Sequence, residues 1–289
     1  MKRFSLWIVA AGLLASACQA RGAASIGPAP SGHAGPSASP STGPSPSPAT
    51  SSPSRSPTSS HKVTFQIWFL RHGMLFETKR TDLFSPRVAQ LALDAMLEGP
   101  SHLESGLEIW TAMPAAGTVG NITELSNGTA TVQMSDNFYD GQSTTVRLRQ
   151  AQVVYTLTQY PTIRRVRFGM TDGSVRPKTW NRAAFENLLP AIVVDSPMIG
   201  ARVSTPVTVS GTANVFEATV SLRILDENGK ELARTFTTAT CGTGCRGDYS
   251  VAVRFHVDHR QQGIVEVFEA SAQDGSPINV VDIPVILVP

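Results

Sequence analysis

Residues 85–100, SPRVAQLALDAMLEGP, decide the fold class of the segment around them. Ser85 suits the N-cap of a helix, Pro86 suits its first position, and Gly99-Pro100 ends it. Apolar residues recur at helical spacing and predict one buried face. They are Val88, Leu91, Ala92, Ala95 and Met96. The stretch therefore predicts an amphipathic helix.

Strands are predicted on both sides of this helix. VTFQIWFLR, residues 63–71, is rich in β-branched and aromatic residues, and LFETKRTD, residues 75–82, fits as its hairpin partner. Downstream, Asn127-Gly128 separates two apolar stretches within residues 118–138. This dipeptide is typical of a tight hairpin turn, so a second hairpin is expected there.

A second helix and a closing strand complete the first half. STTVRLRQAQVVYTLTQYP, residues 143–161, predicts a helix that Pro161 ends. Its expected buried stripe is Leu148, Ala151, Val154, Tyr155 and Thr158. IRRVRFGM, residues 163–170, predicts a strand with Ile163, Val166 and Phe168 facing inward. The order β-β-α-β-β-α-β predicts an α+β domain over residues 63–178, with its helices on one face of the sheet.

Three stretches of this domain carry a family resemblance: RTDLFSPRVAQLALDAMLEGP (80–100), GTVGNITELSNGTATVQMSDNF (117–138) and QYPTIRRVRFGMTDG (159–173). Together they resemble the sporulation and germination GerMN domain. The resemblance implies an exported or membrane-anchored envelope protein that takes part in assembly or binding. It brings no catalytic residues with it.

Residues 190–289 consist of period-2 segments separated by turn signals. About seven short strands in ~100 residues predict an all-β immunoglobulin-like sandwich. Inward-facing residues are expected at Val251, Val253, Phe255 and Val257. SPMIGARVSTPVTVSGTANVFEATVSLRILDENGKEL (196–232) and VEVFEASAQDGSP (265–277) are similar to the immunoglobulin-like domain of bacterial spore germination. That similarity implies presentation or recognition at the cell surface.

The amino terminus, MKRFSLWIVAAGLLASAC, begins with Lys2 and Arg3 and continues with an apolar run too short to span a bilayer. Residues 1–17 therefore predict a signal peptide. Ala15-Ser16-Ala17-Cys18 resembles the lipobox of bacterial lipoproteins, which implies that Cys18 is acylated and anchors the protein to the outer side of the cell membrane. Simple secretion with cleavage nearby is the alternative.

Residues 18–62 are predicted to be a disordered linker, because Ser, Pro, Gly, Ala and Thr offer almost no apolar surface to bury. Removal of Lys2 and Arg3 takes the formal net charge of +2 to about zero. The composition therefore gives no reason to expect a nucleic-acid partner.

The stretch CGTGCRGDYS, residues 241–250, holds the remaining cysteines. With Cys18 lipidated, Cys241 and Cys245 are the one pair left in an oxidising compartment, which predicts a disulfide. Three alternatives stay open. They are a zinc site with His256 and His259, a redox-active dithiol, and adhesion through Arg246-Gly247-Asp248.

A basic cluster gives the candidate binding residues, Arg147, Arg149, Arg165 and Arg167. Arg165 and Arg167 are expected to alternate outward on their strand, and Arg147 and Arg149 to lie on the polar side of their helix. The cluster is either a solvated face or a patch for an acidic envelope polymer or partner protein.

The sequence contains no G-x-S-x-G or H-E-x-x-H motif and predicts neither a cofactor nor a metal. It therefore predicts a non-enzymatic lipoprotein that binds or scaffolds an envelope protein or cell-wall polymer. An accessory enzyme of cell-wall or spore-coat metabolism and a solute-binding lipoprotein are the alternatives.

Overall fold

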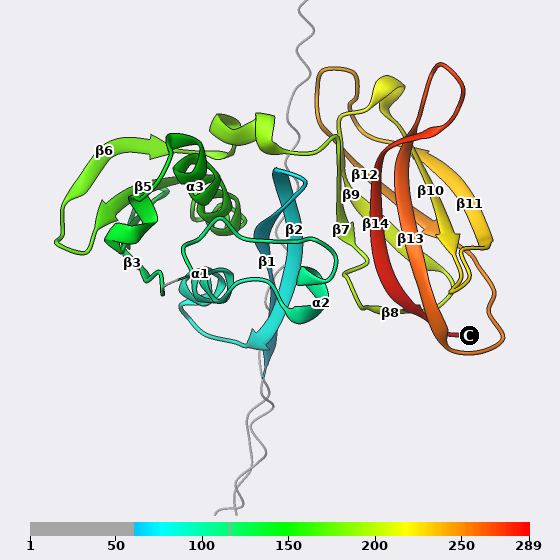
Figure 1. Cartoon of the computed structure of the whole chain (residues 1–289), viewed down its shortest axis with the longest axis horizontal. Helices are drawn as coiled ribbons and strands as arrows, with labels where there is room; N and C mark the ends of the chain where they lie inside the picture. The colour runs from blue at the N-terminus through cyan, green and yellow to red at the C-terminus, as the bar shows by residue number, and fades with distance from the viewer. Residues whose placement is uncertain (1–60, 116) are drawn as a thin grey trace, which may run out of the picture. The chain divides into compact units, whose positions relative to one another are not determined.

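A computed structural model describes residues 61–115 and 117–289. The predicted signal peptide, Cys18 and the linker up to residue 60 lie outside the described residues. The described residues all belong to one compact unit, and Lys62 is already the first residue of strand β1. Within this unit an α+β domain precedes a β-sandwich, as the sequence predicts (Figure 1).

The first hairpin pairs β1 (Lys62–Arg71) with β2 (Met74–Leu83) in antiparallel register. Buried positions do not simply alternate here, because β1 is buried without interruption from Ile67 to Leu70. A strand that is buried on both faces must be covered from both sides. The hairpin therefore lies inside the compact unit.

Helix α1 (Val88–Glu98) begins later than the sequence predicts. Arg87 is its N-cap and makes no side-chain capping bond, whereas Ser85 Oγ accepts a hydrogen bond from the Arg87 N–H at 3.2 Å. The predicted Ser85 N-cap is therefore wrong, since this hydroxyl stabilises the turn that precedes the helix. The end is confirmed, because Gly99 adopts φ +90°, which favours glycine.

A short helix, α2 (His102–Ser105), follows with a complete capping box: Ser101 Oγ accepts the Glu104 N–H, and the Glu104 carboxylate accepts the Ser101 N–H. The chain then enters a four-stranded sheet in the order β3-β4-β5-β6. Its strands are β3 (Gly120–Ser126), β4 (Thr129–Met134), β5 (Arg165–Met170) and β6 (Val175–Trp180). The predicted turn at Asn127-Gly128 is confirmed, with both residues at positive φ.

Helix α3 (Ser143–Leu157) connects the parallel strands β4 and β5, after the short η1 turn (Asp136–Tyr139). Contacts join α3 to β1, to α1 and to β5. Both helices therefore lie between the β1–β2 hairpin and the four-stranded sheet (Figure 1). The sequence predicts helices on one sheet face; the structure adds a separate two-stranded sheet on their other side. For this reason α3 buries far more than one stripe, including Gln152 and Thr156.

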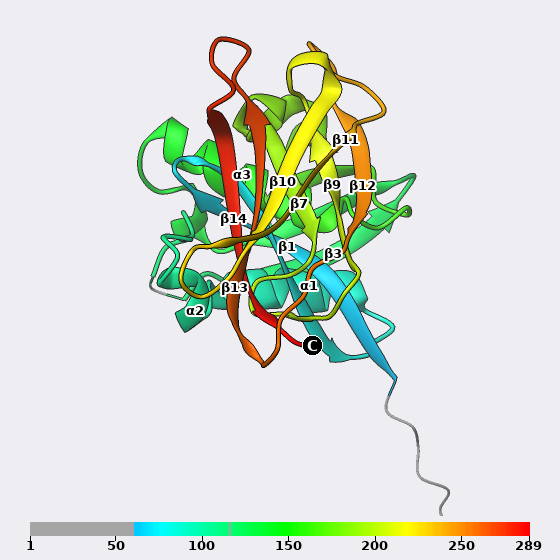
Figure 2. The ribbon, with the colours of Figure 1, turned by 90° about the vertical axis from the view of Figure 1, so that its right-hand side faces the viewer.

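A 3-10 segment, η2 (Arg182–Leu188), leads into the sandwich. A five-stranded sheet has the order β11-β10-β13-β14-β8, and a three-stranded sheet has the order β12-β9-β7. Figure 2 shows β10, β11, β13 and β14 side by side. The strands are β7 (Ile192–Ser196), β8 (Arg202–Val203), β9 (Val207–Ala213), β10 (Thr219–Leu225), β11 (Glu231–Thr238), β12 (Gly247–Val253), β13 (Gln261–Ala270) and β14 (Pro277–Leu287).

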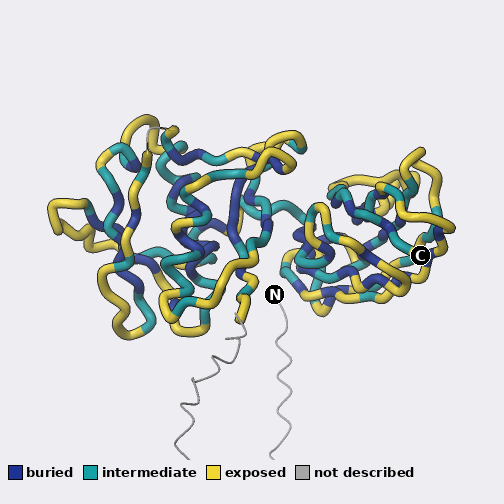
Figure 3. The backbone as a smooth tube through the Cα atoms, turned by 90° about the horizontal axis from the view of Figure 1, so that it is seen from below, coloured by how far each residue is buried: buried dark blue, intermediate teal, exposed yellow. Residues whose placement is uncertain are grey.

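Two hydrophobic cores stabilise the unit. One fills the α+β domain around Phe69, Phe138 and Phe168, and the other fills the sandwich around Val209, Leu222 and Val265. Buried backbone runs through the interior of both domains, while loops carry most exposed residues (Figure 3). Residues 251–257 alternate as predicted, except that Val251 is only half-buried.

Candidate functional site

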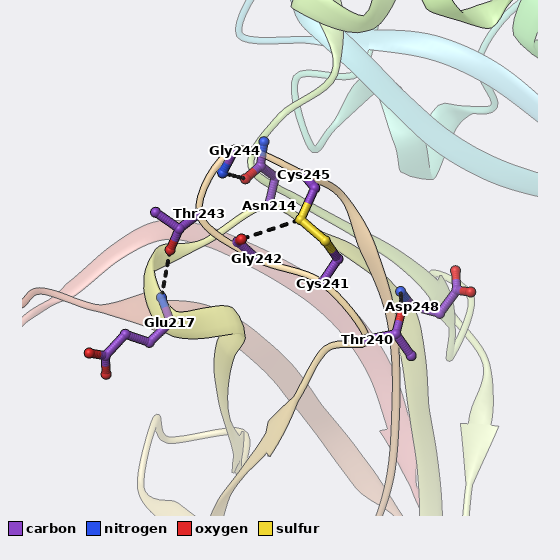
Figure 4. Close-up of a disulfide and its surroundings, with 9 residues drawn as sticks. All are labelled: Asn214, Glu217, Thr240, Cys241, Gly242, Thr243, Gly244, Cys245 and Asp248. Carbon is purple, nitrogen blue, oxygen red and sulfur yellow. Dashed lines mark hydrogen bonds between the residues drawn. A yellow bond between two sulfur atoms is a disulfide. The ribbon is translucent and has the colours of Figure 1, made fainter. Parts of the chain in front are cut away.

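The two cysteines of residues 241–250 are joined in a disulfide, with their Cα atoms 5.7 Å apart (Figure 4). Neither sulfur is therefore a thiolate that could bind zinc. His256 lies exposed and its Nε2 is 3.0 Å from Asp258 Oδ1. In residues 61–115 and 117–289, no group of three His, Cys, Asp or Glu side chains is placed to hold a metal ion.

The disulfide loop braces the turn before β10 (Figure 4). Thr243 Oγ1 accepts the Glu217 N–H at 3.0 Å, the Thr243 N–H donates to Val215 O at 3.0 Å, and the Gly244 N–H donates to Asn214 Oδ1 at 3.0 Å. In the braced turn, Glu217 and Ala218 adopt backbone φ angles of +53° and +56°, which residues other than glycine rarely adopt. The loop thus has a structural role.

Loss of this crosslink is expected to be measurable. The double variant Cys241→Ser/Cys245→Ser should lower the free energy of unfolding by about 2 kcal/mol, since closure of so short a loop removes little chain entropy. Urea denaturation of the variant and the wild type measures the difference. In the native protein, thiol alkylation at Cys241 and Cys245 should require prior reduction; two thiols that react without reductant would contradict the pairing.

Arg246 is not available as an adhesion signal. Its Nη2 donates to Pro190 O at 2.5 Å, and its Nη1 donates to Thr212 O at 3.2 Å. Gly247 is buried, and only Asp248 of the three residues is exposed. A receptor would need both charges on one exposed loop, so the arginine of this motif instead holds the segment between the two domains in place.

The predicted basic cluster is divided by the fold. Arg165 and Arg167 lie on the sheet face opposite to the buried Val166 and Phe168, as expected. Arg147 lies on the other side of the sheet, stacked over the Phe185 ring at 4.9 Å and bonded to Ala184 O. These residues therefore do not form one patch.

The prediction that Arg149 lies on the polar side of its helix is wrong. It is 8% exposed, and its guanidinium donates to Ala112 O and Phe138 O at 2.8 Å each and to Asp140 O at 2.7 Å. The reason is that α3 has protein on more than one side, so its polar positions also face backbone. Arg149 satisfies loop carbonyls and is not a surface ligand for a polymer.

The most unusual polar group lies where β2 meets β7. Glu77 on β2 is 7% exposed and interacts with the carboxyl group of Asp195 on β7. Lys79 Nζ lies 3.6 Å from Glu77 Oε1 and donates to Asp195 O at 2.6 Å. Two carboxyl groups and one ammonium group therefore meet at the junction of the two domains.

Burial, the largest cause, and the interaction with Asp195 together raise the pKa of Glu77 from 4.5 to about 9, while Lys79 and Arg182 act in the opposite direction. Two adjacent carboxyl groups do not both ionise readily when water is excluded. At neutral pH the Glu77 carboxyl group is therefore protonated and can share its proton with Asp195.

A cleft of about 350 Å³ opens beside this pair. Trp68 and Tyr155 supply its aromatic side chains, with ring centroids 4.9 Å apart. Arg182 from η2 lies over both rings, and its Nη2 donates to Tyr155 O at 3.0 Å. The remaining lining includes Glu186, Asp195 and Arg246. Polar and aromatic side chains from both domains therefore meet around one cavity, which makes it the candidate functional site.

Replacement of Glu77 by glutamine should change how stability depends on pH. Because the pKa is about 9 in the folded chain and 4.5 ordinarily, the folded state keeps a proton that the unfolded state loses. The free energy of unfolding of the wild type should therefore fall as the pH rises from 4.5 towards 9. Glu77→Gln stays neutral and should be more stable than the wild type by about 2 kcal/mol at pH 8.

Urea denaturation between pH 5 and pH 8.5 measures this difference. Glu186→Gln is the matched control, because it removes an exposed carboxylate from the same cleft. It should leave the pH dependence of the wild type in place. Parallel curves for Glu77→Gln and the wild type would contradict the buried, protonated state.

Of the cleft residues, only Arg246 is a residue that the sequence marks out as a candidate, through the Arg246-Gly247-Asp248 motif. A signal for Glu77 does exist: it stands two residues after Leu75 in a strand, and both are buried. A carboxylate in register with an apolar residue indicates a charge on the buried face. The positions of Arg182 and Asp195 have no such signal, because β7 and η2 meet β2 only through the fold.

Two family models match the chain. Residues 74–175 match the family described as sporulation and spore germination, and residues 191–276 match the immunoglobulin-like domain of bacterial spore germination. The two matches therefore define the two domains of the chain as domains of the sporulation and germination type. The chain carries a GerMN domain followed by this immunoglobulin-like domain.

Solved structures with a similar fold include the first GerMN domain of the sporulation protein GerM from Bacillus subtilis, at 20% identity and a TM-score of 0.34, over 40% of this chain and 87% of that chain. The tandem GerMN domains of the same protein match at 14% identity and a TM-score of 0.36, over 67% of this chain and 62% of that one.

A putative lipoprotein from Clostridium perfringens matches at 14% identity and a TM-score of 0.29, over 44% of this chain and 93% of that one. No curated protein matches the chain. Within the part of the chain that the structure describes, no helix has the length and apolar character needed to cross a membrane.

Proposed function

We propose that this protein is a lipid-anchored, non-enzymatic binding or scaffolding protein of the bacterial cell envelope. Its domains are of the sporulation and germination type, and such domains are not known enzymes. The lipobox-like Cys18 supports the anchor, although it lies outside the described residues. The partner is an envelope protein or a cell-wall polymer.

The observation that carries the proposal is how the cations at the domain junction are used. Arg246 donates to Pro190 O, and Lys79 donates to Asp195 O. Arg182 donates to Tyr155 O. A cation that binds or activates a substrate needs its donors free for that substrate, whereas these donors already satisfy the protein's own carbonyls. They support a rigid two-domain unit that presents its surfaces to a partner.

A second candidate, an accessory hydrolase of the wall, is favoured by one observation. Glu77 and Asp195 are carboxyl groups with very different surroundings beside a cleft, which is a pattern found in acid–base catalysis. However, the two interact directly. Hydrolysis of a glycosidic bond by a carboxyl pair needs about 5 Å or more between the groups to admit the substrate. The binding function therefore agrees better with the geometry.

Crosslinking on intact cells, followed by mass spectrometry of the captured species, tests the proposal. The wild-type chain should fractionate with membranes and capture the same envelope protein or wall fragment in repeated experiments. Cys18→Ser is the control for the anchor, because it should release the chain from membranes without changing the folded domains. A chain that remains soluble with Cys18 intact, or that captures no envelope component, would contradict the proposal.

A further inference from the structure

Buried polar atoms without a partner gather around the cleft. Trp68 Nε1, Glu77 Oε1 and Arg246 Nε are all buried and have no hydrogen-bond partner within the described residues. All three residues line the same cavity. Since buried donors and acceptors are almost always hydrogen-bonded, three of them around one cavity indicate that another molecule completes their bonds.

Trp68 and Glu77 are the two most buried of these residues. Trp68 is 2% exposed; its backbone N–H donates to Thr156 Oγ1 at 3.1 Å and its carbonyl accepts from Gln152 Nε2 at 3.1 Å. Its ring packs against Tyr155 and lies beneath Arg182. Lys79 Nζ lies 3.6 Å from Glu77 Oε1, which is beyond hydrogen-bond length. Trp68 is therefore positioned in advance of any ligand, and Glu77 Oε1 is left without a hydrogen bond beside it.

The size of the cavity limits what can fill it. About 350 Å³ equals the liquid volume of about twelve water molecules and lies at the lower end of ligand pockets. Two or three waters would leave much of it empty. One ring-sized polar ligand fits this volume.

The charges around the cavity favour a neutral ligand. Among the residues that line the cavity, Arg182 and Arg246 are balanced by Asp195 and Glu186, and Glu77 is protonated at neutral pH. The Nη groups of Arg246 are bonded to Pro190 O and Thr212 O, so its guanidinium cannot bind a carboxylate or phosphate through two parallel bonds. The groups that stay free are the single N–H groups of Trp68 and Arg246 and a carboxyl oxygen of Glu77. Such single donors and acceptors are suited to hydrogen bonds with hydroxyl groups.

We propose that this cleft binds one residue of a neutral, hydroxyl-rich glycan. In this complex the Trp68 indole N–H donates a hydrogen bond to the sugar, and the carboxyl group of Glu77 is the second hydrogen-bonding partner of the sugar. The inference rests on the proposed binding function and gives the chemical class of the partner. Trp68 and Tyr155 contribute the aromatic surface on which the less polar face of a sugar ring packs.

The test is an NMR titration of the full chain, in which the indole N–H signals are followed while a sugar is added. Glucose and N-acetylglucosamine are the neutral probes, and glucuronate and glucosamine are their charged counterparts. The Trp68 signal, identified by its loss in Trp68→Phe, should shift and saturate with a neutral probe. The same signal should not respond to either charged probe.

Variants separate this cleft from the rest of the surface. Trp68→Phe keeps an aromatic ring but removes the donor, so it should raise the Kd about three- to tenfold. Trp110→Phe is the matched control, because Trp110 is 43% exposed and lies outside the cleft. It should leave the Kd unchanged. Glu77→Met provides a second loss of affinity if Trp68→Phe does not fold.

Any of three results would overturn the inference: no saturable shift of the Trp68 signal, equally tight binding of a charged probe, or an equal loss of affinity in Trp110→Phe. The first would mean that the cleft holds solvent only. A chain that captures envelope partners on cells but binds no neutral sugar would reject the inference and leave the proposed function standing. A chain that binds sugar in vitro but captures no envelope component would reject the proposed function instead.

Discussion

Replacement of Glu104 by glutamine should lower the free energy of unfolding by about 3 kcal/mol, because it leaves the half-buried Arg80 without its counter-ion. Glu104 is 3% exposed. Its carboxylate accepts two bonds from Arg80, at 2.8 and 2.6 Å, one from the Thr78 hydroxyl, and one from the Ser101 N–H at 2.7 Å. One side chain therefore ties β2 to the start of α2.

The same carboxylate should make the wild type sensitive to acid. Burial alone would raise the pKa of Glu104, but the bonds from Arg80, Thr78 and Ser101 outweigh it and lower the pKa to about 2. A depressed pKa in the folded state gives stability that is present above the ordinary value of 4.5 and is lost as the pH falls towards 2. Glu104→Gln cannot lose this contribution, so its stability should change less across that window.

Urea denaturation at pH 7 and at several values between pH 5 and pH 2.5 measures both effects. Glu108→Gln is the control, since its side chain is 77% exposed and its partner His72 is 4.0 Å away. It should change the free energy of unfolding by less than about 0.5 kcal/mol. Equal effects of the two substitutions at pH 7 would show that the Glu104 network does not stabilise the fold.

Replacement of Arg149 by methionine should cost about 3 kcal/mol of stability, since it leaves several carbonyl groups without donors. The guanidinium reaches carbonyls of two separate loops, at Ala112 on one side and at Asn137, Phe138 and Asp140 on the other. Methionine fills a similar volume but donates no hydrogen bond. The loop before β3 and the loop after β4 should then separate more easily.

Arg165→Met is the matched control for this variant, because the sequence places both arginines in one basic cluster and the structure leaves Arg165 exposed on β5. It should alter stability by less than about 0.5 kcal/mol. Thermal and urea denaturation compare the two variants. A stability loss in Arg165→Met as large as in Arg149→Met would mean that the fold does not distinguish these residues.

Much of the fold follows from local patterns in the sequence. The Asn127-Gly128 turn, the Gly99 helix end and the alternation of residues 253–257 are each confirmed, because turn chemistry and side-chain period act within a few residues. The predicted start of α1 is wrong by a few residues. Ser85 can cap either a helix or a turn, and the local sequence does not distinguish these two roles.

The candidate site could be predicted far less well. Cys241 and Cys245 lie close in sequence, so their proximity is a local property. Glu77 and Asp195 are separated by more than a hundred residues, and their strands belong to different domains. No period or motif in either strand indicates that the other one lies beside it.

By itself the sequence determined which segments are helices and strands, that an α+β domain precedes a sandwich, and which families the two domains resemble. These properties depend on periodicity and turn residues, which each segment carries within itself. The tertiary structure alone decided that Arg149 is buried, that Arg246 holds the segment between the domains, and that Glu77 meets Asp195 beside a cleft. Such outcomes depend on which surfaces pack together, because burial and a neighbour's charge come from residues distant in the chain.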